Sequence, residues 1–561
     1  MNPALAILRT DTPWYHRPSL VKWAVGLIIF GAVINLLTLW LNAPFDLSED
    51  ETHYWEWARH LDYGYYSKPP GIAWLMWANV HLGQLLGIPA DSTAWMRTPA
   101  VILSALVGFL GFDLSRRVFR DDRVGLLLMV INAAVPMFVV GAVLLTIDSP
   151  MFACWALASW ALWRYVETPE QGEWVRQPRW LYLSALAVAV GLLFKPLLIA
   201  FPLSVIVMAM ASRTLRQRLW SWHLLPAVAI MLCSQIPFIL WNSHHDWVTF
   251  KHMRSQAGVG QTVKGNPILA FLGRLGEYVG GQVGAMAGFM FMLLVMAIWK
   301  AFGARKQLGD AATFGLTFLL ALSLPLWTFY LFLTIGTKIQ INWPAASYFT
   351  GMMVLAGIAC RYWTSENRKH QKAWSRWMIF TVIWGLAFTT LAQNLHHFYP
   401  LMAQPRKWDP SIKLRGHAQR GQILHDKFIV PMTASLGRKP LLAAPRYGQA
   451  SSLAFYLPGQ PFVYSLMSVM GERMTQYDLW PGLNERRADG TLVHQGEPVL
   501  YFSEFELTPE QCTKIFNPAF RTLEYLGQTP VTVNGATIRT IYVYLGSDFR
   551  GFPETTPNGR F

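Results

Sequence analysis

The stretch DLSEDETHYWEWARHLDYGYYSKPPGIAW, residues 46–74, follows closely on the apolar run VKWAVGLIIFGAVINLLTLWL, residues 21–41. The run is long enough to cross a bilayer. Four carboxylates therefore stand at the expected membrane surface: Asp46, Glu49, Asp50 and Glu51. Carboxylates crowded at such a surface repel one another and must be hydrated or paired. The stretch is either a loop that keeps charge out of the lipid or a site that uses the charge.

The composition indicates a polytopic membrane protein. Of the 561 residues, 53% are hydrophobic and only 14% are charged, whereas soluble domains contain roughly 25% charged residues. The net charge of +15 does not favour a nucleic-acid-binding protein, because the basic residues lie in short clusters between apolar segments. Cys154, Cys233 and Cys360 lie within apolar runs and Cys512 stands alone. We therefore expect no structural disulfide and no C-x-x-C metal site.

The first apolar run is expected to remain as an uncleaved anchor, because its only plausible cleavage box is followed by Pro44. The Trp-rich segment 69–87 is assigned to the membrane surface, since the basic connections then alternate regularly with the others. Further spans are expected at 97–118, 124–144, 150–166, 181–194, 197–211, 223–241, 281–300, 311–334, 343–362 and 376–396. The assignment predicts a polytopic α-helical protein with about 11, and up to 13, transmembrane helices.

The basic connections also predict the orientation of the chain. Clusters such as RRVFRDDR, residues 116–123, and SRTLRQR, residues 212–218, fall on one side together with the N-terminus. The positive-inside rule makes this side the cytoplasm. The remaining connections then face the periplasm of a bacterial inner membrane: 42–96, 145–150, 242–280, 335–343 and everything after about 397.

The composition after about residue 397 changes to that of a water-soluble α/β module. KPLLAA (439–444), PFVYSL (461–466) and PVLYFS (498–503) are typical of short strands. Thr508 predicts the N-cap of a helix, and Asn534-Gly535 predicts the turn of a hairpin. With roughly 165 residues the module is large enough to bury its own core. We expect 1–396 to form a transmembrane catalytic domain and 397–561 a periplasmic α/β domain.

The unusual polar residues lie on the side that is predicted to face the periplasm. Besides the acidic stretch they include Asp148 and a set of later residues: Lys195, His244, His245, Asp246, Lys251, Arg254, Lys338 and Asn342. Carboxylates that face cations near a bilayer suit a reaction in which a base activates a hydroxyl. The cations would then hold an anionic, lipid-borne leaving group.

Each of these residues also has a purely structural interpretation. Asp148 stands two residues before Pro150 and would equally well cap the following helix. Lys68 and Lys338 are placed as snorkelling interfacial lysines are. His244 and His245 could ligate a metal, although adjacent histidines in a polar loop are more often only solvated. No single residue decides between these alternatives.

A series of motifs in a fixed order carries more information than any single residue. The motifs are DETHYWEW (50–57), GYYSKPP (64–70), RTP (97–99), TIDSP (146–150), NSHHDW (242–247), NWPA (342–345), RYGQASSLAFY (446–456) and QYDLW (476–480). The series resembles the membrane glycosyltransferases of the type C fold. These include the protein O-mannosyltransferases, the lipid A aminoarabinose transferases and, most similar, the bacterial enzymes of families 39 and 83. The resemblance implies transfer of a sugar from a polyprenyl-phosphate carrier to a periplasmic acceptor.

The resemblance also implies roles for individual residues in an inverting transfer. Asp50 would be the catalytic base, with Glu51 and Asp148 orienting the base and the acceptor. The candidates for binding the donor phosphate are Lys68, Arg59, Arg97, Lys338 and Arg446, and those for the acceptor or its loop are Tyr54, His245 and Asn342. The aminoarabinose transferases carry a metal-binding Glu where this chain has Ser67. No cofactor is expected to be required, and a divalent metal is doubtful.

A transporter or flippase of a lipid-linked glycan is the alternative of another class. It would place ionisable residues within the spans near the bilayer midplane, and the predicted spans contain few of them away from their ends. The sequence does not select the sugar, nor whether the acceptor is lipid A, a glycolipid, a polysaccharide or a protein.

Overall fold

A computed structural model describes residues 8–9, 13–41, 45–169, 173–258, 266–402, 407 and 409–553. Pro44, on which the expectation of an uncleaved anchor depends, lies outside the described residues. The chain divides into two compact units. The first unit comprises Met1–Trp40, Arg97–Leu240 and Gln256–Leu391, and the second comprises Leu41–Met96, Trp241–Ser255 and Ala392–Phe561.

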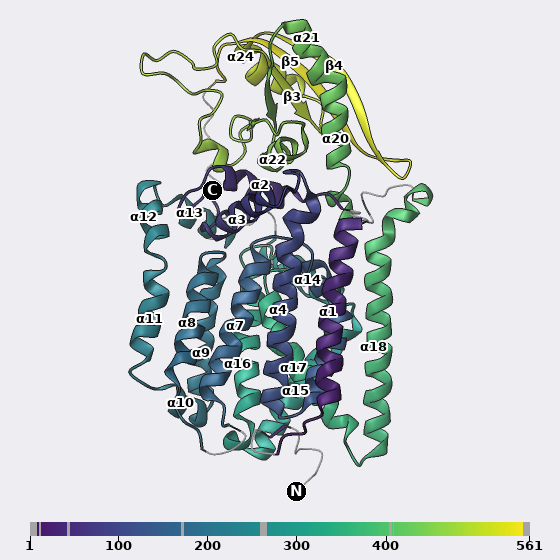
Figure 1. Ribbon diagram of the computed structural model, residues 1–561. Helices are drawn as coiled ribbons and strands as arrows, with labels where there is room; N and C mark the ends of the chain where they lie inside the picture. Colours follow the sequence, from purple (N-terminus) through teal and green to yellow (C-terminus); the bar gives the residue numbers. More distant parts are fainter. Residues whose placement is uncertain are drawn as a thin grey trace. The chain divides into compact units, whose positions relative to one another are not determined.

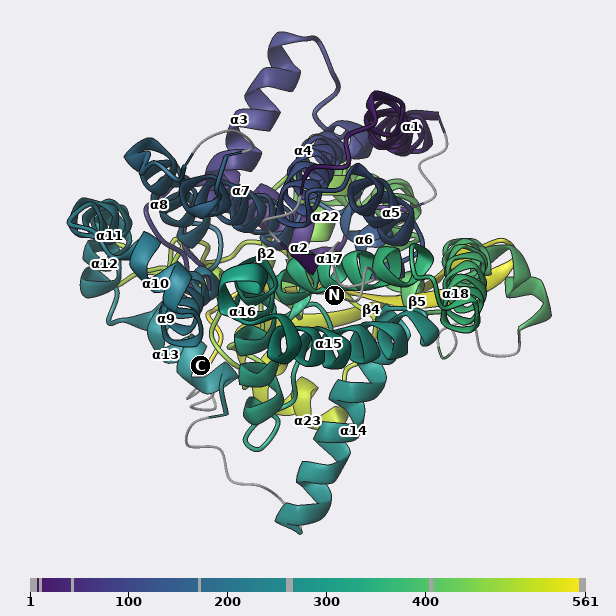
Figure 2. The same ribbon diagram turned by 90° about the horizontal axis from the view of Figure 1, so that it is seen from below.

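The first unit consists of helices, most of which run roughly parallel in Figure 1 and are seen nearly end-on in Figure 2. They are α1 (Pro18–Leu41), α4 (Thr93–Phe119), α5 (Asp122–Ala133), α6 (Pro136–Gly141), α7 (Asp148–Val166), α8 (Pro178–Leu192), η2 (Pro196–Ile199), α9 (Ala200–Ala211), α10 (Arg213–Leu219), α11 (Leu224–Cys233), α12 (Ile236–His244), α14 (Pro267–Ala285), α15 (Phe289–Leu308), α16 (Asp310–Leu333), α17 (Ala345–Trp363) and α18 (Arg368–Asn394).

Several of these helices are long and apolar enough to cross a membrane. In the described part of the chain five meet both criteria: Pro18–Leu41, Thr93–Phe119, Leu224–His244, Asp310–Leu333 and Arg368–Leu401. The pair α14 and α15 would add a sixth if it forms one span bent by 101°. A helical protein with several apolar helices is thereby confirmed, whereas the count of about 11 spans stays a prediction.

The segment 242–300 differs from its expected form. A loop was expected at 242–280, followed by one continuous span at 281–300, but the structure has α13 (Val248–Gln256), α14 and α15 there. Asn266 starts α14 because its side chain accepts hydrogen bonds from the next turn and Pro267 fixes the first helical residue. The helix ends before Gly288, where positive φ angles of 52° at Ala287 and 69° at Gly288 break the helical path.

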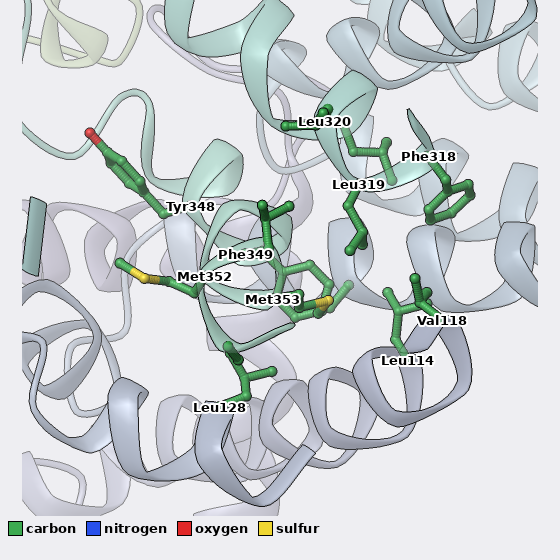
Figure 3. Packing of buried hydrophobic residues seen from close by; sticks show 14 of the residues in the cluster. Leu114, Val118, Leu128, Phe318, Leu319, Leu320, Tyr348, Phe349, Met352 and Met353 are labelled. Atoms are coloured by element: carbon green, nitrogen blue, oxygen red, sulfur yellow. The ribbon is translucent and has the colours of Figure 1, made fainter. Parts of the chain in front are cut away.

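The core of the first unit is formed by tightly packed helices. Leu114 and Val118 of α4 lie near Leu319 of α16, and Phe349 and Met353 of α17 lie beside them (Figure 3). A Cβ atom at Gly357 of α17 would stand 2.3 Å from the Phe119 ring of α4. This glycine therefore allows the two helices to approach closely.

The second unit combines short helices with a mixed sheet. The helical segments are α2 (Glu49–Arg59), α3 (Gly71–Leu85), α13, η3 (Leu395–Leu401), η4 (Pro410–Leu414), α20 (His417–Leu424), η5 (His425–Ile429), α21 (Val430–Leu436), α22 (Tyr447–Tyr456), η6 (Gln476–Asp478), α23 (Pro509–Gln511), η7 (Cys512–Phe516) and α24 (Asn517–Ala519). The 15 residues of α3 span about 22 Å at 1.5 Å per residue. This is less than a bilayer core, and it agrees with a surface segment.

The sheet has the order β2-β1-β3-β5-β4. Its strands are β1 (Leu441–Ala444), β2 (Val463–Ser465), β3 (Val499–Ser503), β4 (Phe520–Val533) and β5 (Ala536–Phe549), and β1 pairs in parallel with both β2 and β3. All three predicted strands and the hairpin are thereby confirmed. Asn534 and Gly535 turn it with φ angles of 47° and 79°. Thr508 forms the predicted N-cap, in a capping box with Gln511.

Candidate functional site

The acidic stretch begins helix α2 of the second unit. Ser48 and Glu51 form a capping box: the Ser48 hydroxyl accepts the Glu51 amide at 3.2 Å, and the Glu51 carboxylate accepts the Ser48 amide at 2.9 Å. Glu51 is fully buried, whereas Asp50 before it is exposed. The structure therefore gives Glu51 a role in fixing the start of the helix that carries Asp50.

The other two carboxylates of the stretch contact the C-terminal part of the same unit. The Asp46 carboxylate accepts the amide of His417 at 2.6 Å and caps α20, whose own N-cap residue is Gly416. A Cβ atom at Gly448 of α22 would stand 2.5 Å from Glu49 Oε2, so Glu49 packs against this helix. Burial raises the pKa of the Glu49 carboxyl, against the opposing charge of Arg420. Both carboxylates thus serve the attachment of α2.

Helix α2 packs along α22, which contains the motif RYGQASSLAFY. The Trp55 ring meets the Phe455 ring edge to face at 5.1 Å between centroids. The Leu47 amide donates to the Tyr456 hydroxyl at 2.6 Å. Two motifs that lie some 400 residues apart in the sequence are therefore neighbours within one unit.

Asp50 and His53 lie one turn apart on α2 and share one face of the helix. The His53 ring lies 4.6 Å from the Tyr447 ring, and its Nε2 accepts the Trp57 indole N–H at 3.1 Å. Burial, together with the charge of Arg473, lowers the pKa of His53 to about 3. His53 is therefore a neutral ring at physiological pH.

The GYYSKPP motif forms a turn beside α2. The Tyr65 amide donates to the Lys68 carbonyl at 3.0 Å, and the Tyr65 ring stacks on Trp57 at 4.4 Å. The Tyr66 amide donates to Gln476 Oε1 at 2.7 Å, which joins this turn to the QYDLW motif. These contacts of Tyr65 and Tyr66 fix the turn that carries Lys68.

The NSHHDW motif supports the same turn. The Asn242 side chain accepts the Thr249 amide at 3.2 Å, and the Thr249 hydroxyl donates to the Tyr65 carbonyl at 2.8 Å. The His245 ring stacks on Trp241 at 3.9 Å. No group of three His, Cys, Asp or Glu residues is placed to hold a metal among the residues that the structure describes. The stacking on Trp241 and the hydrogen bond between His245 Nδ1 and the Trp241 carbonyl at 2.8 Å fix the His245 ring in this loop.

Three further predicted residues of the second unit have defined neighbours. Arg59 lies over the Trp55 ring at 4.9 Å and pairs with the buried Glu56 at 3.3 Å. Arg446 pairs with Glu472 at 3.2 Å, with both side chains about half exposed. Tyr54 is buried and meets the Trp57 ring at 5.3 Å. Arg59 and Arg446 therefore each have a carboxylate partner already.

A second group of predicted residues lies in the first unit and meets at Asp148. The Lys195 ammonium lies 2.6 Å from Asp148 Oδ1, and the Asn342 amide donates to Asp148 Oδ2 at 2.6 Å. The N-cap of α7 is Ile147, so Asp148 is the first helical residue and its side chain turns to Lys195 and Asn342. The structure thus favours a polar cluster over the alternative in which Asp148 only caps the helix.

The two remaining predicted cations of the first unit differ in burial. Lys338 pairs with Glu277 of α14 at 2.9 Å, and 73% of its side chain is exposed. Arg97 is buried, with 1% exposure. The motif series selected both residues, but only Arg97 has the buried environment in which a charge acts strongly.

The sequence reasoning missed Arg473. Its guanidinium lies 5.3 Å from the Tyr447 ring centroid and 5.9 Å from that of Tyr66. Both tyrosines belong to quoted motifs, but Arg473 belongs to none of them. Only its position shortly before QYDLW could have drawn attention to it.

Comparison with known proteins finds similarities both in sequence and in fold. The family described as dolichyl-phosphate-mannose-protein mannosyltransferase matches residues 67–241. A similar curated protein is the lipid A galacturonosyltransferase RgtD of Rhizobium johnstonii, which is 22% identical over 344 residues. The match covers 59% of this chain, and the chain spans 65% of the length of that relative.

Solved structures of ArnT from Cupriavidus metallidurans share the fold. The apo structure matches with a TM-score of 0.58 at 14% identity, and the structure bound to undecaprenyl phosphate with 0.54 at 16%. Each match covers 94% of this chain and 98% of the ArnT chain. At these identities the likeness shows the fold alone. Together with the family match and the curated relative, it supports the type C fold that the series of motifs predicts.

Proposed function

We propose that the protein is an inverting glycosyltransferase that moves a sugar from an undecaprenyl-phosphate carrier to an acceptor of the cell envelope. The observation that carries the proposal is the position of Asp50. It is exposed at the first turn of α2, whereas Glu51 beside it is fully buried in the capping box. A carboxylate that solvent and substrate can reach in this position suits a general base.

The reaction is a single displacement. An acceptor hydroxyl or amine attacks the anomeric carbon while its proton passes to Asp50. A new bond forms between the acceptor and the sugar, and the bond from the sugar to the phosphate oxygen breaks. Undecaprenyl phosphate leaves with the electron pair, and nearby cations stabilise its charge. General-base catalysis of this kind contributes roughly 10² to 10⁴ in rate.

The supporting residues divide by unit. In the second unit, the Glu51 capping box holds α2, and Lys68 is a candidate for the donor phosphate. In the first unit, we assign the cluster of Asp148, Lys195 and Asn342 to orienting the acceptor, with Arg97 as the candidate for the phosphate. Arg59, Lys338 and Arg446 each belong to an ion pair. Binding of a phosphate by any of these three would require exchange of a carboxylate partner.

The comparisons support the choice of substrates. One of the ArnT structures of the same fold is bound to undecaprenyl phosphate, which favours this carrier as the donor lipid. RgtD is a lipid A galacturonosyltransferase, which favours lipid A over a polysaccharide, a glycolipid or a protein as the acceptor. The matches are with transferases, and none supports the alternative of a transporter or flippase.

The reaction is proposed for the periplasmic side of the bacterial inner membrane, with the N-terminus in the cytoplasm. The alternation of basic connections supports this orientation, and it places the sheet after residue 397 in the periplasm. A reporter fused near residue 400 that is active only after export should give a signal. A signal from a reporter that works only in the cytoplasm would contradict the placement.

Transfer of sugar in detergent tests the function. Purified protein is incubated with a polyprenyl-phosphate sugar and lipid A, and the modified lipid A and released polyprenyl phosphate are measured by mass spectrometry. A transferase gives both products in equal amounts without a membrane gradient. A protein that moves the lipid across vesicles but gives neither product in detergent is instead a flippase.

A further inference from the structure

Arg473 has no carboxylate partner among the residues that the structure describes. Its Nη1 donates to the Met474 carbonyl at 3.2 Å, and its guanidinium faces the rings of Tyr66 and Tyr447. Among the described residues it forms no ion pair, whereas its neighbour Glu472 pairs with Arg446. A guanidinium carries five N–H donors. Its positive charge is therefore not balanced by a carboxylate of the described residues, and an anionic ligand could pair with it.

The surroundings of Arg473 connect it to the face of α2 that carries Asp50. Burial, and then the negative charge of Asp50, raise the pKa of Tyr447 to about 12, and the charge of Arg473 acts on the same hydroxyl in the opposite direction. The Tyr447 ring also lies against His53, which is neutral. Arg473 is thus the positive charge beside this tyrosine, and Asp50 is a negative charge close to it.

The segment that carries Arg473 is held in place by its neighbours. Thr475 and Asp478 form a capping box, and Gln476 accepts the Tyr66 amide. The two tyrosine rings support the guanidinium by cation–π contact. A side chain ordered before binding loses less conformational entropy when a ligand arrives. The planar fork of arginine matches the geometry of phosphate oxygens better than lysine does.

We propose that Arg473, held between Tyr66 and Tyr447, binds a phosphate oxyanion of a substrate beside Asp50. The proposal rests on the proposed transfer and adds a phosphate-binding residue from outside the motifs. Two sources have the required chemistry: the phosphate of the polyprenyl carrier and a phosphate group on the acceptor lipid. A measurement of binding without turnover separates the two.

The experiment uses the full-length protein in detergent and undecaprenyl phosphate as the probe, with binding followed by native mass spectrometry. Arg473→Gln should raise the Kd of the probe by roughly 10- to 100-fold if the carrier phosphate is the ligand, since a charge-assisted hydrogen bond is lost. If this Kd is unchanged, the Kd of lipid A, measured in the same way, should rise by a similar factor. Arg473→Lys keeps the charge without the fork and should give a smaller loss.

Arg438→Gln is the matched control, because Arg438 also belongs to the second unit and pairs with Glu497 at 3.2 Å. Thermal unfolding should be the same for the two glutamine variants. The proposal is overturned if Arg473→Gln leaves both the Kd of undecaprenyl phosphate and the Kd of lipid A at the values of Arg438→Gln. The binding arm stands even if the wild type transfers no sugar, so failure of the proposed reaction is seen separately.

Discussion

Replacing Asp50 by Asn removes one negative charge and keeps the size of the side chain. Asp50 lies in the first turn of α2 and is exposed, and its charge interacts favourably there with the helix dipole. A carboxylate in this position stabilises a helix by about 0.3–1 kcal/mol. Glu49 and Glu51 in the same turn repel it, which reduces this contribution. The variant should therefore unfold at nearly the temperature of the wild type.

The effect on turnover should be far larger. Loss of a general base costs roughly 10² to 10⁴ in rate, which corresponds to an increase of about 2.7–5.4 kcal/mol in the activation barrier. This is several times the largest effect expected on stability. Turnover and unfolding temperature, measured together, thus distinguish a catalytic base from a solvated loop residue.

The assay compares Asp50→Asn with Glu51→Gln, because glutamine can still close the capping box with Ser48. Turnover is measured as transfer from a purified polyprenyl-phosphate sugar to lipid A, on protein shown to be folded by thermal unfolding. Asp50→Asn should lose far more activity than Glu51→Gln. Near-normal turnover in Asp50→Asn would refute the assignment of the base and move the search to Asp148.

Three further predictions follow from the contacts. Asp46→Ala should lower the stability by about 0.5–2 kcal/mol through loss of the α20 cap, and Asp46→Asn should restore it; thermal unfolding checks both. Burial raises the pKa of Glu56 from 4.5 to about 7, so the native state should lose stability as the pH rises through this interval. Glu56→Gln should flatten this pH dependence of stability, which is followed by unfolding from pH 4 to 8. A double-mutant cycle on kcat/KM with Asp148→Asn and Lys195→Gln should show a coupling of about 0.5–3 kcal/mol; additive effects would contradict a functional pair.

Most features of the fold that could be predicted are local sequence patterns. The strands at 441–444 and 499–503, the hairpin turn at Asn534-Gly535 and the cap at Thr508 each depend on a few neighbouring residues. The break at Ala287–Gly288 was not predictable in this way. Residues 281–300 contain no proline and read as one apolar helix. Whether a glycine bends a helix or continues it depends on tertiary contacts that a single segment does not reveal.

The candidate site was predictable as far as the family motifs extend. They selected Asp148 and Asn342, which meet in the structure together with Lys195. They could not show that Glu51 caps its own helix. Arg473 could not be predicted, because its environment is formed by Tyr66 and Tyr447. Tyr66 is remote from it in the sequence, and Tyr447 belongs to another motif. A single arginine without periodic or paired neighbours gives no local signal.

The acidic stretch combines anchoring with the proposed chemistry in six residues, and this affects how mutations in it are interpreted. Negative charges are favourable at the start of a helix, so Glu49 and Glu51 can gather there without breaking α2. Through Asp46 and Glu49 the same stretch contacts α20 and α22. Loss of an anchoring residue such as Asp46 or Glu49 would displace Asp50 and lower activity, although the anchoring residue itself touches no substrate. A fall in turnover therefore identifies a catalytic residue only where the isosteric amide keeps the cap and the unfolding temperature, and within this stretch we expect Asp50 alone to meet that condition.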